Sequence, residues 1–434
     1  MASTYLSRTP TTTNQKTATL SFWIKKAKTV AENDELFCFG LYPSLNTRLY
    51  FRDGADLNKL ALDNYGGSTL GFVTNQLFRD YSAWYHIVVA FDTTQTTDTN
   101  RLKLYVNGEQ VTSFASINYG SLNDNLAFNN SSSVNYIGKN HQPKYFDGSM
   151  ADVYFIDGLA YDASTFGSFD STTGIWKPNI APTVTYGANG FNLKFTNGAD
   201  AGEDFSGNNN DLATNGTPTQ TLDCPSNVFA TMNPLVYNPN QANYNPLFSN
   251  GNTTTSSNTS VNAFSNARAT LAVTRGKWYA EFKITSSDAN MAIGLINYTS
   301  GVRSANNWGL TYQNDGAVSF NPNGSITINN VTSGTSFSGY ASGDILQLAF
   351  DRTSEKIWLG KNGTWFNSGN PSSGTNELLD LSSTIGNDEF WTFAVGFYHS
   401  VSEVWNANFG NGYFGTTAVV SAGTNAGIGT FEYD

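Results

Sequence analysis

Charged residues are scarce in this sequence. Of its 434 residues, 23 are Lys or Arg and 34 are Asp or Glu, so charged residues make up 13% of the chain, about half of the roughly 25% found in ordinary soluble domains. The formal net charge is −11. Binding to nucleic acid relies on basic side chains that displace counterions from phosphates. We therefore expect no nucleic-acid partner.

Cysteine is also scarce, and long apolar runs are absent. Two cysteines, Cys38 and Cys224, cannot form a disulfide framework, and Cys38, within an apolar run, is expected to be a small buried hydrophobe. No stretch approaches 18 consecutive apolar residues, so we expect no membrane insertion. Residues 1–10 are polar and contain no apolar segment of the kind a secretory signal requires.

Aromatic residues and turn formers are abundant. The sequence has 22 Tyr, 30 Phe, 9 Trp and 40 Gly, a composition typical of strands joined by Gly, Asn and Asp turns. Sustained helical periodicity is almost absent. Segments with alternating or apolar patterns predict strands at 19–24, 84–91, 102–106, 152–156, 276–284, 291–296, 344–350, 356–359, 390–398 and 404–409.

The chain is expected to have two domains and a connector. Residues 181–260 contain several prolines and the polar tracts NNN and NTTTSSNTS, a composition that cannot bury enough apolar surface to fold alone. We interpret them as a partly ordered connector, laid against its neighbours, between domains at 1–180 and 261–434.

The two domains contain a similar sequence of motifs. Each contains Trp-Tyr, then a strand ending in Ala-Phe-Asp, then a partner strand that ends in Asn-Gly, at 107–108 and at 362–363. Asn-Gly between strands predicts a tight hairpin, because both turn residues adopt positive φ. Two β-sandwiches with a similar central hairpin account for this similarity, and a chance similarity between two hairpins is the alternative.

Both domains resemble known families. The first domain resembles the laminin-G/pentraxin group of concanavalin A-like jelly rolls through LSFWI, WYHIVVAFD, LKLYVNG and FDGSMADV. The second resembles SPRY (B30.2-like) domains through GKWYAEF, AFD, IWLGKNG and NFG. The resemblance implies an all-β fold of two concanavalin A-like jelly-roll β-sandwiches, joined by the Pro/Asn-rich connector.

The combination is similar to virion proteins of marine bacteriophages. The similarity lies in YLSRTP near the start, DFSGNNNDL and DCPSNVFATMNP in the connector, and GTFEYD at the end. It implies a fibre or appendage protein on a phage particle. Two features depart from the pattern: relatives of this type often continue beyond Phe-Glu-Tyr-Asp, which fits a chain cut short, and no N-terminal adaptor precedes the first domain.

Catalytic patterns are weak. A retaining glycosidase needs two carboxyl groups about 5–5.5 Å apart, but Glu281 is interpreted as a lone outward carboxylate, and the neighbours Asp388 and Glu389 would point to opposite faces of a strand. The three histidines are too scattered for a catalytic relay, and His86 is read as a satisfied core histidine. We therefore expect no enzyme activity.

Calcium is a possible cofactor of the first domain, since hard cations prefer loop carboxylates and carbonyls. If the sandwich brings their loops together, the ligands are Asn123, Asp124, Asp147 and Asp152. The alternative is ordinary turn chemistry.

Glycan binding needs flat aromatic rings flanked by polar groups. The expected contacts in loops of the first domain are Tyr119, His141 and Tyr145, and those of the second are Trp308, Tyr312, Trp365, Tyr398 and His399. The alternative for these residues is packing beneath their loops.

These observations predict a non-enzymatic virion surface protein, made in the host cytoplasm, that attaches the particle to host-surface glycan. The expected partners are other virion proteins, host glycan and further copies of the chain in a homo-oligomer, through which weak sites gain avidity. A decoration protein that binds only other virion proteins and a secreted carbohydrate-binding module are the alternatives.

Overall fold

The structure is a computed structural model. It describes residues 4–27, 34–66, 68–236, 245–258, 263–286, 291–299, 310–312, 316–383, 389–399, 401–420 and 429–433. The chain forms two compact units, Met1–Gln220 with Cys224–Val228 and Thr221–Asp223 with Phe229–Asp434. No helix among the described residues is long and apolar enough to cross a membrane.

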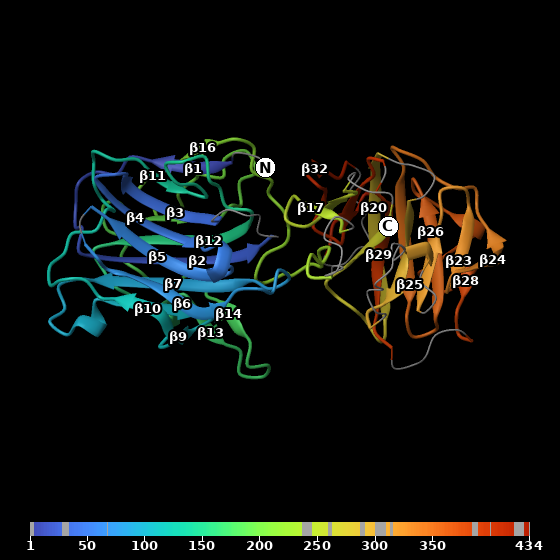
Figure 1. Cartoon of the computed structure of the whole chain (residues 1–434), viewed down its shortest axis with the longest axis horizontal. Coiled ribbons are helices and arrows are strands. Elements are labelled where there is room, and N and C mark those ends of the chain that lie inside the picture. Colours follow the sequence, from blue (N-terminus) through green and yellow to red (C-terminus); the bar gives the residue numbers. More distant parts are fainter. Residues whose placement is uncertain are drawn as a thin grey trace. The chain divides into compact units, whose positions relative to one another are not determined.

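The first unit is a sandwich of two antiparallel sheets (Figure 1). The strands of one sheet are β1 (Tyr5–Arg8), β3 (Asp34–Leu41), β4 (Leu45–Phe51), β5 (Lys59–Tyr65), β6 (Gly71–Leu77), β10 (Phe114–Asn118), β11 (Asn135–Ile137) and β16 (Ala213–Asn215). Those of the other are β2 (Thr17–Lys26), β7 (Tyr85–Asp92), β8 (Leu102–Val106), β9 (Glu109–Gln110), β12 (Gly148–Asp157) and β15 (Phe191–Leu193). The strand orders are β10-β6-β5-β4-β3-β11-β1-β16 and β15-β12-β2-β7-β8-β9.

The second unit is also a two-sheet sandwich. The strands of one sheet are β17 (Leu247–Ser249), β18 (Thr254–Ser256), β20 (Lys277–Ser286), β25 (Ile345–Asp351), β26 (Lys356–Lys361), β27 (Thr364–Trp365), β28 (Leu379–Asp380) and β30 (Val404–Asn408). Those of the other are β19 (Phe264–Arg268), β21 (Ala292–Asn297), β22 (Ala317–Phe320), β23 (Ser325–Ile328), β24 (Val331–Ser336) and β29 (Trp391–Tyr398). The orders are β17-β18-β30-β20-β25-β26-β27, with β28 beside β26, and β19-β29-β21-β22-β23-β24.

The two sandwiches share their strand order. The series β1-β11-β3-β4-β5-β6 matches β19-β29-β21-β22-β23-β24, and β12-β2-β7-β8-β9 matches β30-β20-β25-β26-β27. Even the hairpins agree, because the side-chain oxygen of Asn107 accepts from the backbone N–H of His86 at 2.8 Å, and that of Asn362 accepts from Ile345 at 2.8 Å. The similarity in the sequence therefore reflects a repeat that extends through the whole jelly roll.

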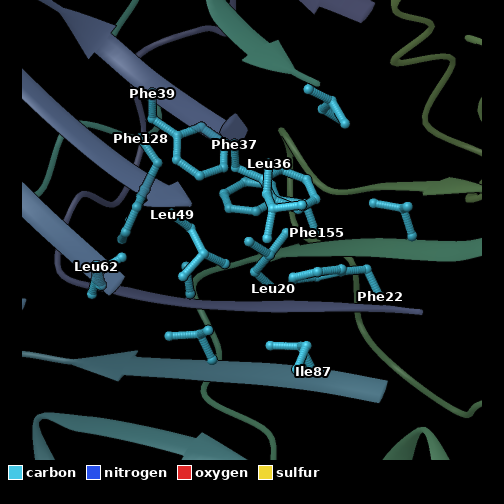
Figure 2. Packing of buried hydrophobic residues seen from close by; sticks show 14 of the residues in the cluster. Leu20, Phe22, Leu36, Phe37, Phe39, Leu49, Leu62, Ile87, Phe128 and Phe155 are labelled. Carbon is cyan, nitrogen blue, oxygen red and sulfur yellow. The ribbon is translucent and has the colours of Figure 1, made fainter. Parts of the chain in front are cut away.

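Each core lies between its two sheets. In the first sandwich the rings of Phe22 on β2 and Phe37 on β3 lie 4.7 Å apart, centre to centre (Figure 2). To compare positions in the two sandwiches, we count from the residue that pairs with the Asp of Ala-Phe-Asp. In the first sandwich this residue is Thr17, which pairs with Asp92, and Phe22 lies five residues after it. Phe282 occupies the same position relative to Lys277 in the second sandwich, and it is equally buried. Every second residue of these strands points inward, as the alternation predicts.

Strand β7 is buried on both faces, as its apolar run predicts. Residues after β12 fold back over the outer face of the β12-β2-β7-β8 layer and include a hairpin of β13 (Gly167–Phe169) and β14 (Trp176–Pro178). Val88 and Tyr154 of the sheet pack there against Phe166. Aromatic residues of this covering segment therefore exclude water from the sheet's second face.

The residues expected to form a connector belong to the two compact units. Strand β15 pairs with β12 and β16 pairs with β1, so residues up to 220 complete the first sandwich. Strands β17 and β18 extend a sheet of the second. The boundaries therefore differ from the expected 180 and 260, because short polar strands find hydrogen-bonding partners at the sheet edges without a core of their own.

Candidate functional site

An open groove of about 640 Å³ lies on the outer face of the first sandwich, over the β3-β4-β5-β6-β10 sheet. Strands β4, β5, β6 and β10 form its floor, and residues 140–144 contribute a wall. The polar residues that line it are Asn46, Arg48, Asp63, Asn64, Thr69, Ser116, Asn118, Asn140, His141, Gln142 and Lys144. The groove therefore combines polar side chains with apolar surface.

Strand register places these polar side chains together. Arg48 pairs with Asp63, and Asn46 pairs with Tyr65, across β4 and β5. Side chains at paired positions point to the same face of a sheet, and the adjacent Leu49 points into the core. The pattern of polar and apolar residues on β4 thus exposes one face for binding while the other holds the sandwich together.

Two carboxylates hold the guanidinium of Arg48. Its Nη1 lies 3.3 Å from Oε1 of Glu35, and its Nη2 lies 3.1 Å from Oδ2 of Asp63. The guanidinium also lies 4.6 Å from the ring centre of Tyr50, whose hydroxyl donates to Asp63 at 2.6 Å. Arg48 is therefore a preorganised donor at the floor of the groove.

Glu35 of β3 pairs with Tyr50, so it lies on the same face of the sheet as Arg48, and it is fully buried there. Burial raises its pKa to about 7, and the charge of Arg48 and a hydrogen bond from Asn140 oppose the shift. Burial is the largest single influence and lowers the pKa of Arg48, but Glu35, Tyr50 and Asp63 together outweigh it, so the net shift is upward and Arg48 stays charged. The 2.8 Å bond from Asn140 to Glu35 ties the groove wall to its floor.

Two exposed tyrosines form the rim. The side chains of Tyr42 and Tyr65 are 52% and 50% exposed, and their ring centres lie 5.0 Å apart at a tilt of 42°. Such exposed rings offer flat apolar surface beside polar groups. No local pattern in the sequence indicates this pair, because Tyr42 follows β3 and Tyr65 ends β5.

Of the first-domain residues predicted to contact glycan, His141 alone lines the groove. Tyr119 is half-buried and packs against the core. Tyr145 lies near Lys139, whose ammonium is 5.9 Å from its ring centre and 4.4 Å from that of Tyr5. Tyr145 is thus engaged in an internal cation–π cluster.

The second-domain predictions are dispersed. Trp308 lies outside the described residues. Tyr312 lies in a short 3-10 helix, Trp365 is half-buried on β27, and Tyr398 packs against an aromatic ring of β19. The structure does not bring these residues together around a groove among the described residues.

The structure contradicts the prediction that His399 contacts a ligand. His399 is fully buried. Its Nδ1 accepts from the backbone N–H of Asn258 at 2.7 Å, and its Nε2 lies 2.5 Å from the hydroxyl of Ser265. Both ring nitrogens are therefore engaged inside the sandwich.

His86 is a satisfied core histidine, as predicted. Its Nδ1 accepts from the indole of Trp176 at 3.0 Å, and its Nε2 lies 2.9 Å from the hydroxyl of Ser21. The ring also stacks on Trp23 at 4.8 Å. Burial lowers the pKa of His86 to about 3, so the ring is neutral at physiological pH.

The four residues predicted for calcium do not form one site. The backbone of Asn123 bonds to Thr93, beside the start of β2, and Asp124 follows it. The carbonyl of Asp147 instead bonds to Ala27, just beyond the end of β2. The ten residues of β2 separate these positions, a span of about 30 Å, so the prediction of a shared site is wrong.

Asp152 does not restore a calcium site. It lies in a bulge of β12 with a φ of 47°, and burial raises its pKa and that of Asp147. No group of three or more His, Cys, Asp or Glu residues suited to a metal occurs in the described part of the chain.

Glu281 is not an outward carboxylate. It is fully buried and accepts the backbone N–H groups of Glu432 and Tyr433 at 2.8 and 2.7 Å. The alternation on β20 correctly assigns Glu281 to the face away from the core, but the end of the chain covers that face. A hydrolytic role for Glu281 therefore loses its basis.

The chain was compared with known families and structures. Residues 2–160 match the family model of the concanavalin A-like lectin/glucanases superfamily. That match covers most of the first sandwich. No curated protein matches the chain.

Solved structures with similarity include the SPRY domain of human HERC1, at 18% identity and a TM-score of 0.30, over 37% of this chain and 91% of that domain. A human SPRY domain matches at 16% identity and a TM-score of 0.28, over 37% of this chain and 93% of that domain. A Limulus polyphemus pentraxin matches at 15% identity and a TM-score of 0.29, over 44% of this chain and 88% of the pentraxin chain. Because these scores are low, the fold description rests on the strand order and cores above.

Proposed function

We propose that this protein binds glycan, without catalysis, through the groove on the outer face of the first sandwich. The observation that carries the proposal is the coincidence of an exposed tyrosine pair and a preorganised Arg48–Asp63 pair in one groove. Tyrosine rings stack on the apolar faces of sugars, and guanidinium and carboxylate groups exchange hydrogen bonds with hydroxyls.

Lack of catalysis is supported by the carboxylates of the groove. Asp63 is partly exposed, but Glu35 is fully buried, and the guanidinium of Arg48 lies between the two carboxylates. A glycosidase needs two carboxyl groups that flank the scissile bond. Asp63 alone can accept hydrogen bonds from a sugar but has no acid partner on the other side of it.

We further propose that the glycan is on a host surface and that the protein acts on a phage particle, together with other virion proteins and further copies of itself. The resemblance to phage virion proteins supports this role, and multiple copies would strengthen a weak site. The alternatives are a decoration protein that binds only other virion proteins and a secreted carbohydrate-binding module.

A glycan array probed with the full-length protein tests the proposal. We expect a defined glycan class to bind, and Tyr65→Ala to weaken that binding at least ten-fold, about 1.4 kcal/mol. Phe169→Ala is the matched control, because Phe169 is 49% exposed on β13, away from the groove. Absence of any glycan signal, also from multimerised protein, would favour the decoration role; equal losses in both variants would rule out the groove.

A further inference from the structure

The last described residues of the chain lie across the outer face of β20 in the second sandwich. The backbone of Thr430 donates to Gly410 at 2.9 Å and accepts from the side chain of Asn408 at 3.0 Å. Beyond this point the segment 429–433 makes no ladder with a strand. Side chains of the sandwich hold it instead.

The carboxylate of Glu281 recognises the backbone of this segment. Its Oε2 accepts from the N–H of Glu432 at 2.8 Å, and its Oε1 accepts from the N–H of Tyr433 at 2.7 Å. The hydroxyl of Tyr279 lies 2.6 Å from the carbonyl of Tyr433. Charge-assisted bonds of this kind are stronger than neutral ones, and they are independent of the side chains of the bound segment.

Two aromatic side chains of the segment give it specificity. Phe431 is buried, and its ring meets that of Tyr279 edge-on, 4.8 Å between centres. The ring of Tyr433 lies against Gly363, where an added Cβ would approach within 2.9 Å of the ring. Gly363 also has a φ of +82°. Phe and Tyr two residues apart therefore fill two positions, one beside Tyr279 and one above a glycine.

The first sandwich covers the equivalent face in a different way. Its hairpin glycine, Gly108, lies against the ring of Trp176, and Ser21 occupies the position equivalent to Glu281, four residues after Thr17 as Glu281 is after Lys277. Trp176, however, belongs to the hairpin of β13 and β14. Only in the second sandwich does a short segment, held by side chains, provide the cover.

We propose that this face of the second sandwich is a binding site for an extended peptide, that its ligand is the segment 429–433, and that the segment of one copy can occupy the site of a second copy. The partner is a second copy because the segment whose fit is visible is the chain's own. In a single copy the attached segment has a high effective concentration. Exchange between copies therefore needs a site that has lost its own segment.

Two full-length variants separate the site from its ligand. The receiver, Phe431→Ala with Tyr433→Ala, keeps the site and weakens its own segment. The donor, Glu281→Gln, keeps the segment and weakens the site. A carboxylate can accept a backbone N–H on each of its two oxygens, whereas the amide of Gln has one acceptor oxygen and a donor NH₂ group. The probe is a fluorescent peptide, Gly-Thr-Phe-Glu-Tyr-Asp.

We expect the peptide to bind the receiver at least ten-fold more tightly than the wild type, whose own segment competes, and to bind a receiver that also carries Glu281→Gln at least ten-fold more weakly. Equal binding to all three proteins, or none to the receiver, would overturn the peptide site. A mixture of donor and receiver should form a one-to-one complex in size-exclusion chromatography. Peptide binding without that complex would overturn the exchange between copies.

A second measurement applies if the receiver does not fold. In the full-length protein, Gly363→Ala should speed hydrogen exchange at the amides of Glu432 and Tyr433 at least ten-fold. Gly374→Ala is the matched control, because Gly374 has a similar φ of +74° but open space around it. Equal exchange in the two variants would show that Gly363 is not part of the site and would overturn the proposal.

Discussion

The two sandwiches share a strand order but use the same outer face differently. In the first, the face of β3, β4, β5 and β6 is open and carries the groove. In the second, the 3-10 helix Leu310–Tyr312 packs on the equivalent face, where Leu310 meets Ala292 and Ala394. The same fold thus carries an open groove on this face in the first sandwich, whereas a 3-10 helix packs on the equivalent face of the second.

Side-chain size explains the difference. Leu310 can approach the second sheet closely because its outer positions hold small residues, and an added Cβ at Gly396 would lie 3.2 Å from Leu310. In the first sheet, large polar side chains such as Arg48 and Asp63 occupy the outer face. Function here follows the residues of one face, and the fold alone does not specify it.

The largest effect should come from equivalent core positions. We expect Phe22→Ala to destabilise the first sandwich and Phe282→Ala the second, each by about 3–5 kcal/mol, because both rings are fully buried. Hydrogen exchange read by region would show loss of protection in the altered sandwich. The exposed residues Phe169 and Phe390 provide matched Phe→Ala controls. Similar losses from core and control variants would contradict the equivalence of the two positions.

The buried histidine of the first sandwich should make it sensitive to acid. The pKa of His86 is about 3 in the folded state against 6.5 for the free group, so the unfolded chain takes up the proton first as pH falls. Stability should therefore decline from about pH 6.5 towards pH 3, by up to about 5 kcal/mol. Melting curves of His86→Gln should start lower at pH 7 and change less with acid. An unchanged pH slope would exclude His86 as the cause.

Glu35 should act in the opposite direction. Its pKa is about 7 when folded and 4.5 when free, so its contribution to stability is lost as pH rises between these values, by up to about 3 kcal/mol. It should partly offset the effect of His86. Melting curves of Glu35→Gln should therefore show a steeper loss of stability between pH 7 and pH 4.5 than the wild type. A loss equal to that of the wild type would show that the carboxyl ionises normally.

The smallest effect tests the paired hairpins. Asn107→Ala and Asn362→Ala each remove a 2.8 Å bond and place alanine at a φ near 50°, so each should cost about 1–2 kcal/mol. Asn→Gly at the same positions keeps the backbone relaxed and should cost less. Chemical denaturation monitored by region would measure both pairs. Unequal losses in the two hairpins would break the correspondence.

The hairpins and core strands could be predicted because their signals are local. The alternation around Phe22 and Phe282, and the turn chemistry of Asn107 and Asn362, concern neighbouring residues. The groove required the register of β4 against β5, which brings Arg48 beside Asp63, and a wall of residues about 90 positions later. A single sequence contains no local sign of that pairing.

The buried polar groups escaped prediction for the same reason. Glu281 lies on the outer face of β20, as alternation requires, but the residue that covers it lies 151 positions away. His399 follows β29 in what looks like a loop, and its partner Ser265 lies 134 positions earlier. Whether a polar residue at a strand end meets water or protein depends on such distant segments.

Sequential closure of the two sandwiches has a consequence for synthesis. All strands that pair in the first sandwich, from β1 to β16, lie within the first 220 residues. The nascent chain can therefore complete the first jelly roll before the strands of the second, which has the same topology, leave the ribosome. Because domains generally fold as units, N-terminal first, this order protects two repeats of equal topology from exchanging strands with each other.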